Sequence, residues 1–169
     1  MENQYKNVNE TRMELANRLF FKLYQCANML HKTGSRAVES EGLTTQQWAV
    51  LGALSTTDEG MSIGALARYL MVSRQNLAGL IGRMERQGHV CSAPDGRDRR
   101  SRLVAMTPAG RLTWEQGAQA KIKDYYTQAL EGFSTSDQVH ALHYLLKILD
   151  NMKRLDDGAG EVVADDETD

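Results

Sequence analysis

The sequence predicts a mainly α-helical domain with one short β-hairpin. Most of the 169 residues fall in segments whose apolar side chains recur at helical spacing. A single stretch, between Gly88 and Thr107, combines strand-compatible residues with a charged, turn-rich connection. With 41% hydrophobic residues the chain has enough apolar side chains for one core, so length and composition indicate one domain.

The first predicted element is one long amphipathic helix over residues 11–36. Its apolar stripe consists of Leu15, Leu19, Leu23, Ala27 and Leu30. The preceding residues 1–10 are polar, and we expect them to form a flexible N-terminus.

Three shorter helices are predicted next. Thr44 is a good N-cap for the first, Ser62 caps a short second helix, and Ser73 caps a third that ends at Gly88. The second and third helices are joined by a tight connection at residues 71–72. This spacing indicates a helix-turn-helix.

The hairpin follows the third of these helices. Strand-compatible residues at 89–93 and 101–106 flank a turn-rich, highly charged connection at 94–100. We therefore expect two short strands with a basic tip.

Two long helices complete the predicted order. Thr107 and Pro108 begin a helix that runs to about Leu130, and Ser134 or Ser136 begins the last helix. The apolar stripe of the last helix consists of Val139, Leu142, Leu145, Leu146, Leu149 and Met152.

This order of elements is that of a winged helix-turn-helix lobe over 44–106, with long helices over 11–36 and 108–155. The three parts together form the predicted single domain, 11–155. A small core does not need such long helices, so their surplus apolar surface predicts a partner chain.

The charge of the chain is divided between two regions. The formal net charge is −2, but residues 156–169 contain seven acids and no Lys or Arg, which leaves +5 for residues 1–155. Between Arg83 and Arg111, seven arginines stand against three acids. We therefore expect a basic body that binds a polyanion and a disordered acidic tail over 156–169.

The helix capped by Ser73 has a polar face suited to reading DNA. At 100° per residue, the buried stripe consists of Leu77, Leu80, Ile81 and Met84. The opposite face consists of Gln75, Gly79, Gly82 and Arg86, flanked by Asn76 and Arg83. In a major groove Gln and Asn can pair with adenine and Arg with guanine, while Ser73 and the helix N-terminus face a phosphate. Arg83 and Arg86 lie further along and are better placed to contact backbone phosphates, which position the protein without reading sequence.

The two glycines on this face favour the same interpretation. Gly79 and Gly82 each cost about 1 kcal/mol relative to alanine in a helix, and close approach of another surface offsets that cost. The alternative is a solvated polar face with two incidental glycines. The candidate DNA contacts on this helix are Ser73, Arg74, Gln75, Asn76, Arg83 and Arg86.

The hairpin supplies further candidate DNA contacts at Arg97, Arg99 and Arg100. These arginines repel one another unless solvent or a polyanion neutralises them, and a thin tip suits the narrow minor groove. Asp98 is expected to pair with a neighbouring arginine and hold the tip in shape. The alternative is a solvated loop.

Three segments resemble a known family. The wing signature at 98–100 and 103–111, the segment 43–51 and the helix-turn-helix at 63–85 look like those of the multiple antibiotic resistance regulator (MarR) family. The resemblance covers residues 11–155.

The resemblance implies an obligate homodimer that joins through the first helix and the last two. Such a dimer binds a pseudo-palindromic double-stranded DNA operator and usually represses nearby genes. In this family Asp98 would anchor the wing, and Arg100 or an adjacent arginine would enter the minor groove. Gly96 stands where proline is common, which leaves open which arginine occupies the tip.

The resemblance also implies a small-molecule effector, either an aromatic carboxylate or an acyl-CoA thioester. Arg18 is the candidate to neutralise a carboxylate, and Tyr24, His31 and Trp48 are candidates to line an aromatic slot. The alternative places Tyr24 and Trp48 in the core and Arg18 and His31 at the surface or an interface.

No motif for catalysis, a cofactor or a metal emerges, so we expect a regulator and not an enzyme. His140 and His143 are predicted to be a surface pair, because no convincing third metal ligand joins them. The absence of a long apolar run predicts no membrane span, and the polar start of the chain indicates a cytoplasmic protein.

The two cysteines, Cys26 and Cys91, are predicted to be structural and not exposed reactive thiols. Two other functions remain as alternatives. One is a thiol-based redox-sensing regulator, and the other is an adaptor that uses the winged helix to bind proteins.

Overall fold

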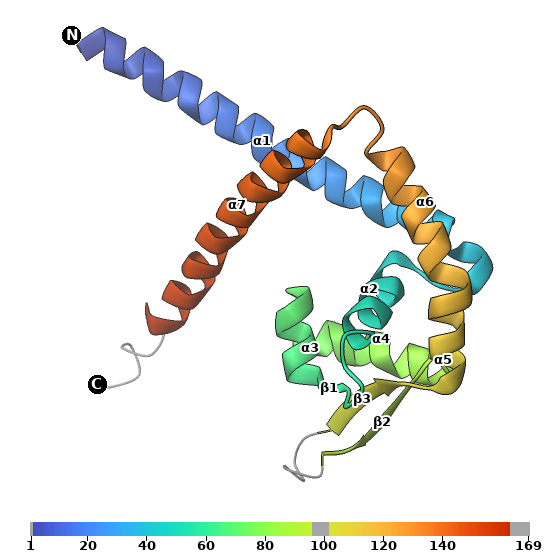
Figure 1. Ribbon diagram of the computed structural model, residues 1–169. Coiled ribbons are helices and arrows are strands. Elements are labelled where there is room, and N and C mark those ends of the chain that lie inside the picture. Colours follow the sequence, from blue (N-terminus) through green and yellow to red (C-terminus); the bar gives the residue numbers. More distant parts are fainter. Residues whose placement is uncertain (1, 96–101, 163–169) are drawn as a thin grey trace, which may run out of the picture. The chain divides into compact units, whose positions relative to one another are not determined.

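A computed structural model describes residues 2–95 and 102–162, with side chains over 11–95 and 102–157. It divides the chain into two compact units, Met1–Tyr126 and Thr127–Asp169. Figure 1 shows the elements of both units. The mainly helical fold with a small antiparallel sheet is confirmed.

The predicted elements appear in the predicted order, together with a 3-10 helix and a short strand that the sequence did not predict. The helices are α1 (Glu2–Ala37), the 3-10 helix η1 (Glu39–Glu41), α2 (Thr45–Leu54), α3 (Ile63–Leu70), α4 (Arg74–Arg86), α5 (Pro108–Leu112), the π-helical η2 (Thr113–Ala118), α6 (Gln119–Ala129) and α7 (Thr135–Val162). The strands are β1 (Met61–Ser62), β2 (Val90–Pro94) and β3 (Arg102–Met106).

Polar side chains cap the helices at the predicted positions. Thr44 and Gln47 form a capping box at the start of α2, and the Ser73 hydroxyl accepts from the backbone N–H of Asn76 at 3.2 Å. The Thr107 hydroxyl accepts from the N–H of Gly110 at 2.9 Å, with Pro108 in the first turn of α5. These caps bond backbone N–H groups that have no partner inside the helix.

The sheet contains a strand that the sequence analysis did not predict. Its order is β1-β3-β2, and β1 pairs with β3 through Met61↔Val104 and Ser62↔Leu103. A two-residue strand has no detectable alternation, so its pairing depends on where the fold brings it. The predicted hairpin is the pair β2 and β3, with Val90↔Met106 at its base and Pro94↔Arg102 at its outer end.

The core of the first unit joins α2, α3 and α4 to the sheet. Its fully buried side chains are Leu51, Leu54, Leu66, Leu77, Met84, Val38, Val50 and Val104. Trp114, Ala118 and Ile122 extend this core into η2 and α6. The helix α4 and the strands β2 and β3 therefore pack against the same hydrophobic core.

Three predicted boundaries differ from the structure. α1 begins at Glu2 and not at Thr11, and α7 continues to Val162, into the segment predicted as a disordered tail. Neither extension contains proline, and a formed helix gains one hydrogen bond for each residue added. The predicted helix from Pro108 to Leu130 is divided into α5, η2 and α6.

Candidate nucleic-acid interface

The side chains of α4 separate into a buried and an exposed face. Leu77, Leu80, Ile81 and Met84 are at most 7% exposed, so the structure buries the four residues that helical spacing selected. Gln75, Asn76 and Arg83 are exposed on the other side. α4 therefore exposes amide and guanidinium groups to solvent, while its opposite face is held in the core.

The arginines of α4 lie over glycines. A Cβ added to Gly79 would lie 3.8 Å from Nη1 of Arg83, and one added to Gly82 would lie 3.8 Å from Nη1 of Arg86. Arg74 lies against α3, with its guanidinium 3.6 Å from the corresponding position on Gly64. The guanidinium groups thus lie beside the glycines at ordinary contact distances, which the sequence pattern did not reveal.

Ser73 holds the N-terminus of α4. Its hydroxyl oxygen accepts from Asn76, and the hydroxyl hydrogen remains available for an acceptor. The free N–H groups and the positive end of the helix dipole are at this terminus, as a phosphate contact requires.

A groove of about 490 Å³ lies beside α4. Its lining includes the buried side chains Leu77 and Leu80, and Gln75, Asn76 and Arg83 contribute polar groups. An apolar site with a few polar groups is typical of small-molecule binding, and any occupant would cover candidate DNA contacts.

The base of the wing, formed by β2 and β3, is described, whereas its tip is not. Arg97, Asp98, Arg99 and Arg100 lie outside the described residues, so their predicted roles stay predictions. Arg102 is described, and its Nη2 donates to the backbone carbonyl of Ser92 at 2.8 Å.

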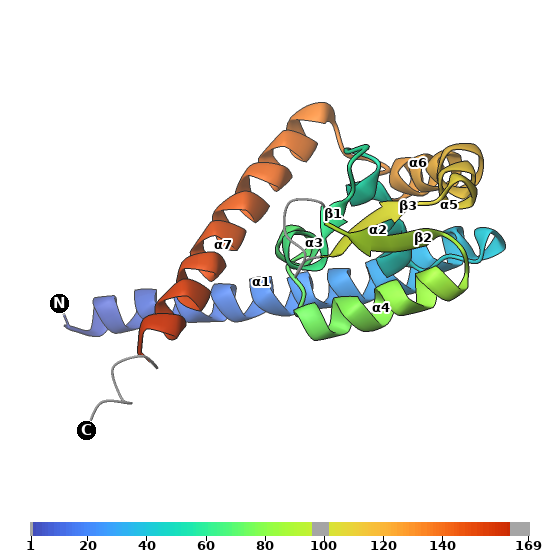
Figure 2. The same cartoon turned by 90° about the horizontal axis from the view of Figure 1, so that it is seen from below.

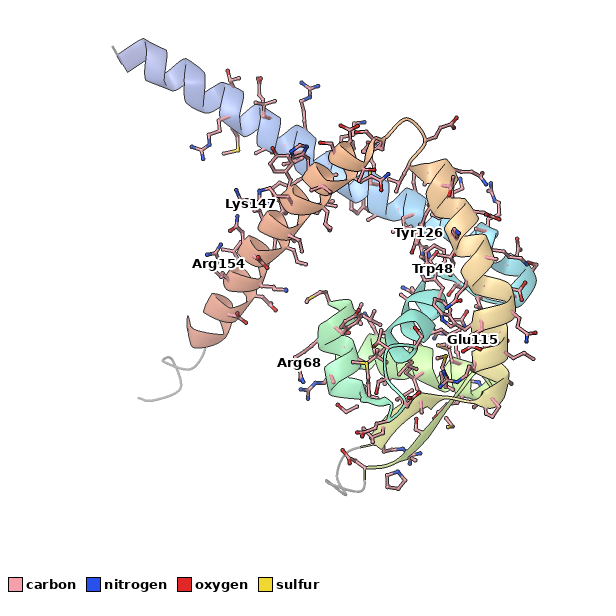
Figure 3. The ribbon with its side chains drawn as sticks, viewed as in Figure 1. Trp48, Arg68, Glu115, Tyr126, Lys147 and Arg154 are labelled. Atoms are coloured by element: carbon pink, nitrogen blue, oxygen red, sulfur yellow. The ribbon has the colours of Figure 1, made fainter. Side chains whose placement is uncertain are left out.

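Trp48 belongs to an aromatic cluster inside the first unit. Its ring is 7% exposed and meets Tyr125 and Tyr126 of α6 edge to face, at centroid distances of 5.8 and 6.0 Å. Figure 3 shows Trp48 and Tyr126 beside each other. The Tyr125 and Thr33 hydroxyls are 2.9 Å apart. Burial raises the pKa of Tyr126, and the neighbouring Tyr125 adds to the effect.

The other effector candidates lie on α1. Arg18 and Tyr24 share an open, shallow site with the exposed rings of Phe20 and Phe21. His31 has an exposed side chain, and its carbonyl accepts from the Thr45 hydroxyl at 3.0 Å. The structure thus brings Arg18 and Tyr24 together and places Trp48 with two tyrosines that the sequence analysis missed, because more than seventy positions separate them.

The prediction that both cysteines avoid an exposed setting is wrong. Cys26 and Cys91 are free and exposed. Cys26 lies on the part of α1 that no described element of its own unit covers, and Cys91 is an outward residue of β2 next to the buried Val90.

No described helix is long and apolar enough to cross a membrane.

Comparisons with known proteins give a consistent picture. The MarR family profile matches residues 41–101. The chain is 72% identical to the transcriptional activatory protein BadR of Rhodopseudomonas palustris, over 95% of this chain and 93% of that protein. It is 30% identical to the homoprotocatechuate degradative operon repressor of Escherichia coli, over 65% of this chain and 72% of that protein.

Solved structures share the fold. CouR of Rhodococcus jostii, bound to p-coumaroyl-CoA, matches with a TM-score of 0.70 and 24% identity over 79% of this chain and 93% of that one. MOSR of M. tuberculosis, in complex with DNA, matches with a TM-score of 0.67 and 22% identity over 79% and 96%.

Proposed function

The chain belongs to the MarR family of transcriptional regulators, and from this premise we propose that it is a homodimer that binds a pseudo-palindromic DNA operator and leaves it when an aromatic acid or its CoA thioester binds. The observation that carries the proposal is the exposed face of α4, where Gln75, Asn76, Arg83 and Arg86 stand over a fully packed core. Each protomer would read one half-site, with half-sites about 34 Å apart.

Operator binding tests the proposal directly. The probe is the duplex that the protein selects from a random DNA pool, and affinity is measured as a function of salt. We expect a linear fall of log K with log salt, with a slope of about −0.9 for each phosphate neutralised. Selection of no sequence, or an affinity independent of salt, would contradict DNA recognition by this face.

The exposed apolar residues of α1 and α7 support dimer formation. Leu15 and Leu19 of α1 are 58% and 52% exposed, and Leu142 and Leu145 of α7 are 58% and 48% exposed. An apolar surface of this extent on long helices is typical of an interface between protein chains.

The aromatic cluster supports an aromatic effector. Trp48, Tyr125 and Tyr126 form an aromatic cluster in which Trp48 is 7% exposed, and CouR of the same fold is bound to an aromatic CoA thioester. Adding p-coumarate or p-coumaroyl-CoA to the protein–operator complex distinguishes acid from thioester. We expect one of them to release the DNA, because an effector that prefers the DNA-incompetent arrangement shifts the population towards it.

The names of the relatives support both directions of regulation, since one is called an activatory protein and one a repressor. We propose repression where the operator overlaps the promoter, because a bound dimer and RNA polymerase cannot occupy the same DNA. In vitro transcription with and without the protein tests the direction. An increase in transcript would make the protein an activator.

The exposed cysteines support thiol sensing as a second candidate function. Peroxide would then release the parent protein from its operator but not the variants Cys26→Ser and Cys91→Ser. Equal release of the parent and both variants would exclude the thiols as sensors.

A further inference from the structure

We propose that Glu85, Ser92 and Arg102 form a latch that fixes the wing relative to α4, and that they are positioning residues for DNA recognition. The inference rests on the proposed function, because it assumes that α4 and the wing contact DNA together. It assigns a role to three residues whose side chains need not touch the DNA.

Ser92 is bonded to both of its neighbouring elements. Its hydroxyl donates to Oε1 of Glu85 at 2.5 Å, which connects β2 to α4. Nη2 of Arg102 donates to the backbone carbonyl of Ser92 at 2.8 Å, which connects β3 to β2 through a side chain. Arg102 is paired with Pro94 in the strand register, so its side chain reaches Ser92 diagonally.

The latch lies farther out along the wing than the other connections to the end of α4. At the base of the wing, the Thr107 hydroxyl donates to the carbonyl of Gly88 at 2.5 Å and the Thr107 N–H donates to that of His89 at 3.1 Å. Ser92 follows His89 by three residues, or about 10 Å of strand. At this level of the wing β1 pairs with β3, through Met61↔Val104 and Ser62↔Leu103, so the bond from Ser92 to Glu85 restrains β2, the strand that β1 does not pair with.

The arrangement of the elements fits this role. Figure 2 shows the chain leaving the end of α4 through a turn and running back beside it as β2. Along this strand, the bond to the Glu85 carboxylate is made at Ser92. Glu85 and Arg102 are exposed and Ser92 is half-buried, so none of the three is part of the core that stabilises the fold.

The charge of Glu85 makes the proposal testable, because the two explanations predict opposite changes in DNA affinity when the carboxylate is removed. A carboxylate on a DNA-reading helix is repelled by phosphates, so its removal raises affinity if electrostatics alone decides. If the carboxylate holds the wing, its removal lowers affinity, because a loose wing must be ordered when DNA binds.

The experiment compares the full-length parent with Ser92→Ala, Ser92→Thr and Glu85→Ala on the duplex that the parent selects from a random pool. We expect Ser92→Ala and Glu85→Ala to bind roughly three- to tenfold more weakly, as the loss of one hydrogen bond predicts. Ser92→Thr keeps the hydroxyl and should bind like the parent. The salt slope should not change, because neither residue neutralises a phosphate.

Hydroxyl-radical footprinting separates positioning from a general loss of structure. We expect Ser92→Ala to lose the minor-groove protection given by the wing and to keep the protection given by α4, with an unchanged melting temperature. Parent-like affinity of Ser92→Ala, higher affinity of Glu85→Ala, or equal loss of both protections would overturn the latch. Failure of the parent to select any duplex would instead overturn the proposed function.

Discussion

At the scale of single residues, Gly79 has an expected use in DNA binding that one substitution tests. It lies beside Arg83, and it removes side-chain bulk from the face expected to meet DNA. A Cβ at this position makes only an ordinary contact with Arg83, at 3.8 Å, so alanine fits the protein itself.

We therefore expect Gly79→Ala to raise the free energy of unfolding by about 1 kcal/mol, the propensity difference between glycine and alanine in a helix. Its operator affinity should fall, because the methyl group stands between α4 and the bases. Urea unfolding and a gel shift measure the two effects. Greater stability with unchanged affinity would show that DNA binding does not need a glycine at this position.

We expect His89 to make the stability of the protein depend on pH. Its Nδ1 is buried without a hydrogen-bond partner among the described residues, and burial lowers its pKa below the usual value of 6.5. The folded state thus favours the neutral ring, whereas the unfolded state binds a proton below pH 6.5.

The stability that depends on neutral His89 is therefore fully present above the pKa that His89 has in the unfolded state. It is lost as the pH falls towards the lower pKa that His89 has in the folded state. We expect the urea midpoint of the parent to decrease between pH 7 and pH 5.5 more than that of His89→Gln. Parallel decreases in the two proteins would assign the pH dependence to other groups.

At the scale of elements, the wing is expected to supply DNA affinity through its tip. Replacing Arg99 and Arg100 together by alanine should weaken operator binding and lower the magnitude of the salt slope by about 0.9 for each phosphate that the wing no longer neutralises. The variant should remain a folded dimer. A matched control removes two charges from α7 through Lys147→Ala and Arg154→Ala, and the wing assignment fails if both double variants bind alike.

The elements also show which parts of the fold local sequence specifies. Helix starts were predicted at Thr44, Ser62, Ser73 and Thr107 because each cap bonds an N–H three residues away. β1 was missed because its two residues gain a partner only when β3, some forty positions later, is in place. The division of the helix after Pro108 was missed for a similar reason, since Trp114 and Ala118 of η2 pack into the core.

At the scale of the whole molecule, dimer formation should depend on one side of α7. Leu145 lies in the apolar stripe and is 48% exposed, whereas Lys147 lies about 200° away around the helix. We expect Leu145→Asp to give a monomer with little operator affinity, because a buried carboxylate without a partner costs several kcal/mol. Lys147→Asp should remain a dimer. Light scattering after gel filtration measures both, and a dimeric Leu145→Asp would exclude this face.

The net charge of −2 hides a basic body of +5 and an acidic segment of −7, which linear counting alone reveals. The sequence by itself determined the order of the main helices and the hairpin, the caps at Thr44, Ser62, Ser73 and Thr107, the faces of α4 and the positions of the arginines. Each of these depends on neighbours within a few residues, so periodicity and composition suffice to find them.

The tertiary structure decided which distant residues meet. It placed Trp48 against Tyr125 and Tyr126, exposed both cysteines, and joined Glu85 to Ser92. These contacts depend on how helices and strands pack around one core, and burial of apolar surface selects that packing with no local sequence signal for any single pair.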